Sequence, residues 1–506
     1  MLSIDDRRPW PPCPAPFNLA AHVLAAGEAQ PDKVALAILK PSGAERWSFG
    51  RLVAAVRGAG TGLLQIGLQP GDRVLMRLGN EPAFPVAYLG AVAAGLVPVP
   101  TNAQLTAEEA TKLATRIAPR LIIAGPGVAL PDPLPCPVLP AADLLAMEAL
   151  PPCAWNMGDP DRLAYVVFTS GTSGSPMAVS HAHRAIWARG MMRVGWEGFA
   201  STDRVLHAGA LNWTYTLGTG LLDPWTVGAT ALVPAAGTAP AQLPLLAKRF
   251  DATVMAAVPG VYRQMLRAPM PALPKLKHAL SAGEKLTPAL RSAWQAATGT
   301  DLHEALGMSE VSTYLSGSDA RPAPPGAAGY AQPGRCLAVL GPDGQAVPRG
   351  QEGVLAVDRR DPGLMLGYLD EPEATAARVS GDWFVTGDRV VMAPDGAITT
   401  LGRNDDLMNA GGFRVAPAEI EAVLAHLPGL AEVAVAEVPV ASGATVIAAF
   451  CVSATPLEPE ALDAQVSVHL ARWKVPRMWV RVDHLPHGPN GKLDRKALPA
   501  LAPRTS

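Results

Sequence analysis

The feature that most constrains the fold is the stretch 165–177, where an apolar run leads directly into a loop of hydroxyl residues and glycines. The β-branched and aromatic residues at 165–168 favour a strand, and Pro176 prevents a helix from forming across the loop. Small residues let backbone N–H groups approach phosphate oxygens, and hydroxyls add further donors. The loop is not a Walker A motif, because no Lys-Ser or Lys-Thr pair follows Gly174. An anion-binding loop and an ordinary surface turn both fit this stretch, so the other motifs must decide between them.

Length and charge narrow the class of protein. A chain of 506 residues exceeds what one hydrophobic core usually supports, which predicts two or three domains. The 42 Lys and Arg against 44 Asp and Glu leave a net charge of −2, and this balance argues against nucleic acid as a partner. The longest apolar stretch, 84–100, is interrupted by Gly90, Gly95 and Pro98, which favours a buried helix running into a strand over a membrane span.

The N-terminal residues and the cysteines indicate the compartment. Residues 1–16 contain four charged side chains and no apolar run of the signal-peptide kind, which argues against export. The five cysteines have no C-x-x-C spacing, which argues against a cysteine zinc site and a disulfide framework. We therefore expect a cytoplasmic protein without a membrane span.

Helical and strand patterns alternate along the first part of the chain. Helices are predicted at 19–26, 49–68, 83–94 and 107–117, and strands at 72–76, 97–100 and 121–123. This alternation predicts parallel sheets covered by helices. Further along, we expect a connection over 125–160, a helix over 181–192 and a strand over 205–207. The glycines Gly58, Gly60 and Gly62 lie within a helical pattern and predict close helix packing rather than nucleotide binding.

Several polar turns follow apolar segments. Ser309 and Glu310 could together hold a phosphate oxygen and its magnesium ion, because hard cations take oxygen ligands; a capped, solvated helix start is the alternative. Asp388 follows a glycine and could accept both hydroxyls of a ribose, and an arginine at 403 or 414 could bind a phosphate with two hydrogen bonds. Lys492 lies on a tight turn near the end of the chain, where a solvated charge is the simpler interpretation.

Taken in this order and spacing, the motifs make the chain resemble the adenylate-forming (AMP-binding) superfamily, which includes acyl-CoA synthetases, firefly luciferase and nonribosomal peptide adenylation domains. The resemblance covers nearly the whole chain, and its most specific parts are 169–176, 307–310, 386–388, 402–414 and 490–492. Residues 211–222, 227–232 and 258–262 are most similar to the benzoate-CoA ligase group.

The resemblance implies an α/β fold with two domains. The N-terminal domain, 1–402, would contain two doubly wound subdomains and a distorted β-barrel. A small, mobile C-terminal α/β lid would comprise 403–506, with its hinge near Asp405. A helical pattern at 417–427 and strand patterns at 432–438 and 445–452 agree with such a lid.

The implied activity is an AMP-forming acid–thiol ligase that uses ATP, Mg²⁺ and coenzyme A. A carboxylate is a poor electrophile, so it is first joined to AMP, and the enzyme must offset the negative charges that converge there. By the same resemblance the catalytic residues would be Lys492, Ser309 and Glu310, with Glu310 binding the metal. The residues that would hold ATP or coenzyme A are Thr169, Ser170, Gly171, Thr172, Ser173, Gly174, Gly283, Glu284, Glu304, Ala305, Leu306, Gly307, Met308, Asp388, Arg403, Gly412 and Arg414.

The acyl pocket would combine aromatic walls with neutral polar atoms. Its expected residues are Ala208, Trp213, Thr214, Tyr215, Gly218, Gly307, Thr313 and Tyr314. No aspartate begins this stretch to pair with an amino group, which disfavours a free amino acid and favours an aromatic or compact carboxylic acid. A medium-chain acid, transfer to a carrier protein, and a non-catalytic ligand-binding protein are the alternatives. A homodimer is compatible with the sequence, which does not determine the oligomeric state.

This sequence departs from the family pattern at three positions. Met177 stands where the glycine loop usually continues with lysine, Leu306 where an aromatic residue is frequent, and Asn409 where many relatives have lysine. The first change removes a cation expected near the outer phosphates of ATP.

We expect Met177→Lys to bind ATP more tightly than the parent protein, because the added ammonium group would offset phosphate charge. Equilibrium binding of ATP by the two proteins checks this, with Met177→Gln as a neutral control of similar length. An unchanged affinity in the lysine variant would contradict it.

Overall fold

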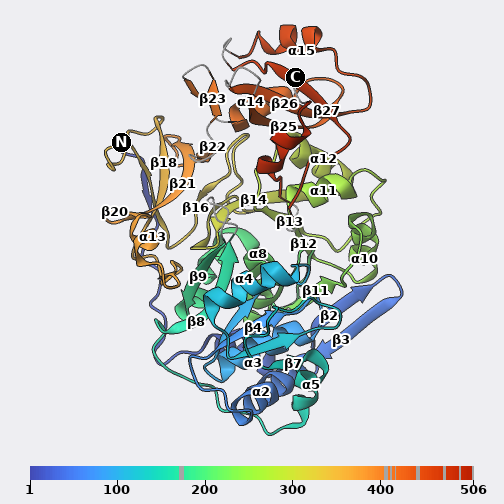
Figure 1. Ribbon diagram of the computed structural model, residues 1–506, viewed down its shortest axis with the longest axis vertical. Coiled ribbons are helices and arrows are strands. Elements are labelled where there is room, and N and C mark those ends of the chain that lie inside the picture. Colours follow the sequence, from blue (N-terminus) through green and yellow to red (C-terminus); the bar gives the residue numbers. More distant parts are fainter. Residues whose placement is uncertain are drawn as a thin grey trace. The chain divides into compact units, whose positions relative to one another are not determined.

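The computed structural model describes residues 1–169, 176–403, 408–410, 413–415, 417–439, 445–470, 474–488 and 492–503 (Figure 1). The chain divides into two compact units. Unit 1 comprises 1–4, 338–356 and 385–506, and unit 2 comprises 5–337 and 357–384. No helix in the described ranges is both long and apolar enough to cross a lipid bilayer.

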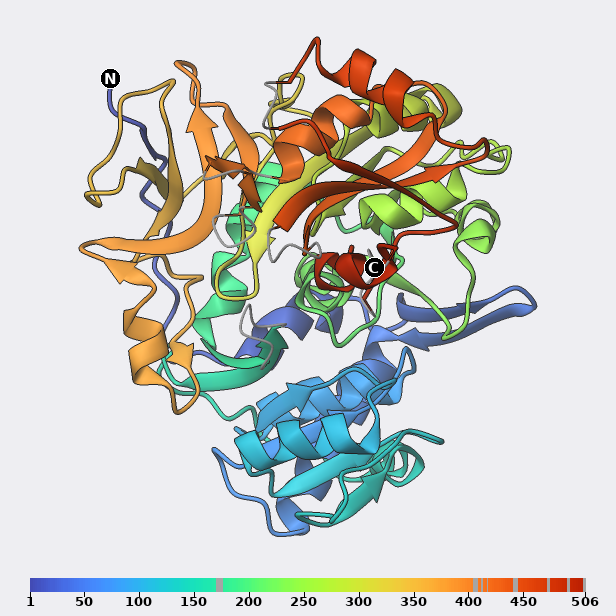
Figure 2. The same cartoon turned by 45° about the horizontal axis from the view of Figure 1, so that its top comes forward.

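Unit 2 contains a four-stranded parallel sheet with the order β5-β4-β6-β7. Figures 1 and 2 show it in blue and cyan with its helices. Its strands are β4 (Arg73–Arg77), β5 (Val97–Pro100), β6 (Leu121–Ala124) and β7 (Val138–Pro140). The helices of this region are α2 (Phe49–Gln65), α3 (Ala83–Ala93), α4 (Ala107–Ile117) and α5 (Ala141–Ala146). The predicted alternation is confirmed, but the expected connection over 125–160 also contributes β7 and α5.

Helix packing explains the three glycines of α2. A Cβ atom would lie 2.3 Å from Met147 O at Gly58, 2.5 Å from Cys153 Sγ at Gly60, and 2.3 Å from Met147 Sδ at Gly62. Contacts this short leave no room for a side chain, so the packing interpretation of these glycines is confirmed. Helix α3 is buried at every residue, which explains its apolar sequence all the way round.

A second, nine-stranded sheet of unit 2 has the order β16-β15-β14-β13-β12-β10-β11-β2-β3. Its parallel centre consists of β2 (Val34–Lys40), β10 (Arg204–His207), β11 (Thr230–Pro234), β12 (Val254–Ala257), β13 (His278–Ala282) and β14 (Asp301–Met308). The antiparallel strands at its two ends are β3 (Gly43–Ser48), β15 (Ser312–Ser316) and β16 (Tyr330–Ala331). The other helices of unit 2 are α1 (Leu19–Glu28), α8 (Thr214–Leu217), α9 (Asp223–Thr226), α10 (Leu243–Arg249), α11 (Pro259–Met265), α12 (Pro288–Thr298) and α13 (Pro372–Ala376).

The third sheet of unit 2 is antiparallel and has the order β19-β9-β8. It contains β8 (Leu163–Thr169), β9 (Met177–Ala182) and β19 (Gly367–Tyr368). The expected helix over 181–192 is partly wrong, because β9 extends to Ala182 and helices α6 (Arg184–Ala188) and α7 (Gly190–Met192) follow it. His181 is paired with Tyr165 of β8, and their rings stack with centroids 4.9 Å apart. This cross-strand contact prevails over the local helical pattern.

Unit 1 contains a three-stranded sheet with the order β25-β26-β27. It is formed by β25 (Leu430–Pro439), β26 (Thr445–Ser453) and β27 (Met478–Val482), with helices α14 (Pro417–Leu424) and α15 (Pro459–Val466). The predicted helix and strands of this region are confirmed, although α14 ends before residue 427. A two-stranded ladder joins β23 (Met408–Ala410) and β24 (Phe413–Val415).

A further six-stranded sheet of the chain has the order β1-β17-β18-β21-β20, with β22 paired to β21. Its strands are β1 (Ile4–Asp6), β17 (Cys336–Leu340), β18 (Glu352–Asp358), β20 (Val379–Ser380), β21 (Trp383–Met392) and β22 (Ile398–Arg403). The expected boundary between residues 402 and 403 stays a prediction.

Candidate functional site

The hairpin β8–β9 frames the predicted phosphate loop. Thr169 ends β8 and pairs with Met177, the first residue of β9. Arg116 Nη2 lies 3.9 Å from Met177 Sδ, and Arg116 also forms an ion pair with Glu371. A guanidinium therefore lies beside the position where the family resemblance leads us to expect lysine, but a carboxylate already balances its charge. The remaining predicted loop residues lie outside the described residues: Ser170, Gly171, Thr172, Ser173 and Gly174.

The turn that joins β14 to β15 contains Ser309 and Glu310 and is held from three sides. His181 Nε2 donates to Ser309 O over 2.7 Å, and Tyr368 Oη donates to Glu310 Oε1 over 2.7 Å. The Met365 N–H donates to Glu310 O over 2.8 Å. The turn connects two antiparallel strands, so the helix-start interpretation is wrong. The oxygen atoms of Ser309 and Glu310 are the ligand type that Mg²⁺ prefers, and they fit such an ion chemically.

Two backbone features allow this turn to be tight. A Cβ atom at Gly307 would lie 2.5 Å from Ser312 O and 2.6 Å from Thr313 Cα, so only glycine fits there. The strand register shifts between Leu306 and Gly307, and Ser312 has φ +75°. The absence of a side chain at position 307 therefore sets how closely β15 approaches β14.

The carboxyl ends of β13 and β14 bring together the residues expected to border adenine. Ser281 pairs with Glu304 and Ala282 pairs with Ala305 in the parallel ladder. Gly283 follows with φ +95°, and Glu284 lies 3.8 Å from Arg263. Sequence motifs that are about twenty residues apart thus share one sheet edge, as expected where α/β sheets bind ligands.

Glu304 is a buried carboxyl group within this edge. Its Oε1 accepts the Leu286 N–H over 2.9 Å, and its Oε2 lies 3.7 Å from Arg291 Nη2. Burial raises the pKa of Glu304 to about 7, although the Leu286 N–H and the Arg291 charge oppose that change. Glu304 therefore titrates near neutral pH in the folded protein.

A small cavity of about 30 Å³ lies beside the Ser309 turn, with room for one or two water molecules. Thr214 and Gly218, both predicted substrate residues, contribute to its lining together with Ser309. The lining also includes residues that the sequence did not suggest, namely Tyr88, Tyr165, His181, Arg189 and Ser312. The lining of the cavity thus contains both aromatic rings and hydroxyl groups.

His181 is a neutral imidazole in this lining. Burial lowers its pKa to about 4, and a carbonyl oxygen can only accept, so Nε2 carries the hydrogen that is donated to Ser309 O. The other ring nitrogen, Nδ1, is buried without a hydrogen-bond partner, as is the hydroxyl of Tyr88. Both groups belong to residues that line the cavity.

The other predicted substrate residues are not among those that line this cavity. The Tyr215 ring packs against Trp213 and His207, with centroids 5.4 and 4.3 Å away, and its hydroxyl donates to Leu280 O over 3.1 Å. Thr313 accepts from Gln332 Nε2 over 3.1 Å. The remaining three positions are Ala208, Gly307 and Tyr314, of which Tyr314 is fully buried.

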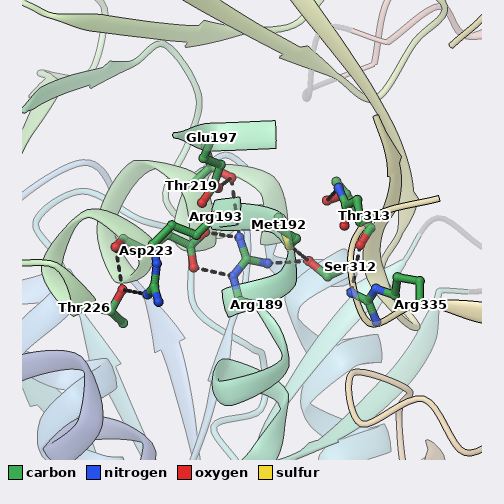
Figure 3. A network of polar contacts seen from close by, with 11 residues as sticks. Arg189, Met192, Arg193, Glu197, Thr219, Asp223, Thr226, Ser312, Thr313 and Arg335 are labelled. Atoms are coloured by element: carbon green, nitrogen blue, oxygen red, sulfur yellow. Dashed lines mark hydrogen bonds and ion pairs between the residues drawn. The ribbon is translucent and has the colours of Figure 1, made fainter. Parts of the chain in front are cut away.

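An ion pair between Arg189 and Asp223 closes one part of the cavity and is almost fully buried (Figure 3). Arg189 Nε donates to Asp223 Oδ1 over 2.7 Å, and Nη1 donates to Ser312 Oγ. Burial and the nearby Asp223 carboxylate raise the pKa of Glu197 well above its usual range. Thr219 Oγ1 donates to Glu197 Oε1 over 2.8 Å. A single charged residue within each of two apolar stretches, 185–192 and 217–227, was the sequence signal for this ion pair.

The remaining predicted residues belong to unit 1. Asp388 of β21 pairs with Arg403 of β22, and the Asp388 N–H donates to Thr386 Oγ1 over 3.1 Å. Lys492 is exposed, and its carbonyl accepts the Gly488 N–H over 2.7 Å. Arg414 lies in β24. The hinge residue Asp405 and the coenzyme A residue Gly412 lie outside the described residues.

Comparison with known proteins identifies the family. The AMP-binding enzyme model matches residues 23–369, and the AMP-binding enzyme C-terminal domain matches 419–492. Human acyl-coenzyme A synthetase ACSM2A is 28% identical, over 96% of this chain and 91% of that protein. The 3-hydroxybenzoate–CoA ligase of Aromatoleum sp. (strain CIB) is 29% identical, over 91% of this chain and 92% of that protein. A benzoate CoA ligase from Burkholderia xenovorans LB400 superimposes with a TM-score of 0.87 at 28% identity, over 95% and 99% of the two chains.

This chain belongs to the AMP-binding enzyme family. It has the mixed α/β fold of that family, with a large N-terminal and a small C-terminal domain. It is an ATP-dependent, AMP-forming acid–CoA ligase.

Glu304 generates a prediction about pH and stability. Its pKa rises from 4.5 to about 7 on folding, so the folded state holds the proton more tightly. The resulting stabilisation is complete below about pH 4.5, and it is lost as the pH rises to about 7. Between pH 5 and 7.5 we expect the unfolding free energy of Glu304→Gln to fall less than that of the parent protein. The difference between the two falls should be roughly 3 kcal/mol at most. Urea unfolding across this range checks it, and parallel pH curves for the two proteins would contradict it.

Gly218 generates a prediction about packing. A Cβ atom there would lie 2.0 Å from Arg189 Nη2, so Gly218→Ala must displace the guanidinium from Asp223. We expect a loss of about 2–4 kcal/mol in unfolding free energy, because a buried charge loses its partner. Gly43→Ala is the control, since a Cβ atom there would have no neighbour within 4 Å. Equal stability of the two variants in urea unfolding would refute this role of Gly218.

Proposed function

We propose that this acid–CoA ligase activates an aromatic or compact carboxylic acid, joining it to AMP and then transferring it to coenzyme A. The observation that carries the proposal is the small cavity beside the Ser309 turn, lined by Tyr88, Tyr165 and His181. The aromatic rings in this lining favour contact with a flat group over a flexible acyl chain. The two relatives named for benzoate and 3-hydroxybenzoate support the same substrate class.

The cavity also disfavours a second carboxylate on the substrate. Its cation, Arg189, already donates to both oxygens of Asp223. A further negative charge would have to displace that buried pair, which costs several kcal/mol. The hydroxyls of Thr214 and Ser312 and the Tyr88 hydroxyl remain as groups that could contact a neutral polar substituent.

The roles proposed for individual residues follow from where negative charge develops during adenylation. Ser309 would bind the α-phosphate and Glu310 the Mg²⁺, which supplies positive charge beside the phosphates when bound. Lys492 would bridge the carboxylate and the α-phosphate, where its ammonium group offsets the charge gathering between the reactants. Asp388 would hold the ribose, with Arg403 nearby. A lid movement about Asp405 would then withdraw Lys492 and bring Gly412 and Arg414 to coenzyme A.

The cellular setting is part of the proposal. All five cysteines carry free thiols, and burial raises the pKa of Cys336 to about 11 and of Cys451 to about 12. Protonated, buried thiols agree with a reducing compartment, so we place the enzyme in the cytoplasm.

Pyrophosphate release from ATP across a panel of carboxylic acids tests the proposal. We expect benzoate and hydroxybenzoates to be activated faster than octanoate, and we expect thioester only when coenzyme A, not a phosphopantetheinylated carrier protein, is then added. Faster turnover of octanoate would overturn the substrate class, and thioester on the carrier alone would overturn the acceptor.

Lys492→Ala tests the catalytic assignment in the same assay. We expect adenylation to fall by about 100-fold or more, because a charge that acts mainly in the transition state is removed. Lys275→Ala, an exposed lysine of unit 2, is the matched control and should retain parent activity. Parent-like activity in the Lys492 variant would refute the assignment.

A further inference from the structure

A cluster of imidazoles and carboxylates lies at the beginning of β13 and β14, at the opposite end of these strands from the Ser309 turn. His278 begins β13 and pairs with Asp301, the first residue of β14. His303 lies two residues further along β14, on the same face as Asp301. Asp319 follows β15 and completes the group. The ligand atoms of Asp301, His303 and Asp319 all lie within 4.8 Å of one another.

Hydrogen bonding determines which nitrogen of His278 is free. Its Nε2 lies 3.0 Å from the backbone oxygen of Glu197, and because a carbonyl can only accept, Nε2 carries the hydrogen. In the neutral ring, Nδ1 then presents a lone pair. This Nδ1 is buried without a hydrogen-bond partner, and the residue is only 4% exposed. The arrangement is the one that metal-binding histidines adopt, with the second nitrogen donating to a carbonyl.

The free lone pair faces a carboxylate. His278 Nδ1 lies 3.5 Å from Asp319 Oδ2, while His303 Nε2 lies 2.6 Å from Asp319 Oδ1. A neutral imidazole nitrogen and a carboxylate oxygen are both acceptors, so they repel each other unless a cation lies between them. Two ligands of a tetrahedral zinc ion lie about 3.4 Å apart, close to the 3.5 Å between His278 Nδ1 and Asp319 Oδ2. The shorter contact between His303 and Asp319 is a hydrogen bond, which the ion would replace.

We propose that Asp301, His303 and Asp319 bind one divalent transition-metal ion of the zinc type, with His278 Nδ1, which lies beside Asp319, as a further nitrogen ligand. Two imidazole nitrogens with carboxylate oxygens suit Zn²⁺ or Co²⁺ better than Mg²⁺, which prefers oxygen ligands alone. The Asp319 side chain is 66% exposed, so the ion has a path from solution. No Cys-x-x-Cys or His-x-x-x-His spacing predicts this site from the sequence, because its ligands come from two neighbouring strands and a later loop.

The role of the site is structural and independent of the proposed function. Residues 303 and 309 are six positions apart along β14 and its turn, about 20 Å at strand spacing, so the ion would not reach the reacting groups. It would tie the segment after β15 to the start of β13 and β14, the two strands whose other ends carry Gly283 and Gly307. Binding to the folded state alone then raises the unfolding temperature.

Zinc binding by the full-length protein without ATP tests the site. After chelator treatment, protein dialysed against buffered Zn²⁺ should retain about one ion per chain and unfold at a higher temperature than the metal-free protein. Mg²⁺ at the same concentration should not produce this shift. Co²⁺ should give the visible absorption of a tetrahedral site with nitrogen and oxygen ligands.

Variants at the ligands decide whether these residues hold the ion. His303→Gln and Asp319→Asn should weaken zinc binding by about tenfold or more. Asp319 is exposed, so its variant should fold even if the His303 variant does not. Asp143→Asn, an exposed carboxylate of α5, is the control and should bind zinc like the parent. Absence of stoichiometric zinc, or equal affinity in Asp319→Asn and the parent, would overturn the proposal and leave a proton-mediated His–Asp pair.

Discussion

The burial of the Arg189 guanidinium is the constraint on which the site in unit 2 depends. A charge removed from water costs several kcal/mol unless a partner of opposite sign and further hydrogen bonds compensate it. Asp223 accepts from two nitrogens of the guanidinium, Ser312 accepts from a third, and Gly218 provides the space. Three segments that are separated in the sequence therefore meet around one buried and paired charge (Figure 3).

The Ser309–Glu310 turn takes its position from this arrangement and from the hairpin beside it. His181 of β9 donates to Ser309 O, and Tyr368 of β19 donates to Glu310, so the small antiparallel sheet supports the turn from outside the large one. In the role proposed for this turn, groups held in this way would need little reorganisation when charge builds up on a phosphate, and such preorganisation is a main source of electrostatic catalysis. The neutral state of His181 also keeps a competing cation away from the turn.

The two ends of β13 and β14 carry different chemistry. At the carboxyl ends, Gly283 has a positive φ and Gly307 lets β15 approach β14 closely, at the sheet edge where parallel α/β sheets usually bind ligands. At the amino ends, His278 and His303 are buried beside Asp319, where a cation would serve packing rather than reaction. One pair of strands thus connects a region suited to catalysis with a region suited to stabilisation.

Local pattern determined much of the secondary structure. The helices α2 to α4, the strands β4 to β6 and the packing role of Gly58, Gly60 and Gly62 follow from periodicity and residue size, which are properties of neighbouring residues. The order of the glycine, serine and lysine motifs likewise sufficed to recognise the family, because it depends only on distances along the chain.

The tertiary structure determined which residues that are distant in sequence contact one another. His181 belongs to a strand rather than a helix because Tyr165 is its partner across the hairpin, and the Ser309 turn joins two strands because β15 pairs with β14. The cavity residues Tyr88 and Arg189 and the pairing of His278 with Asp301 depend on strand register and on the burial of charge. These are contacts between residues distant in sequence, and the sequence alone carries no local signal for their distance in space.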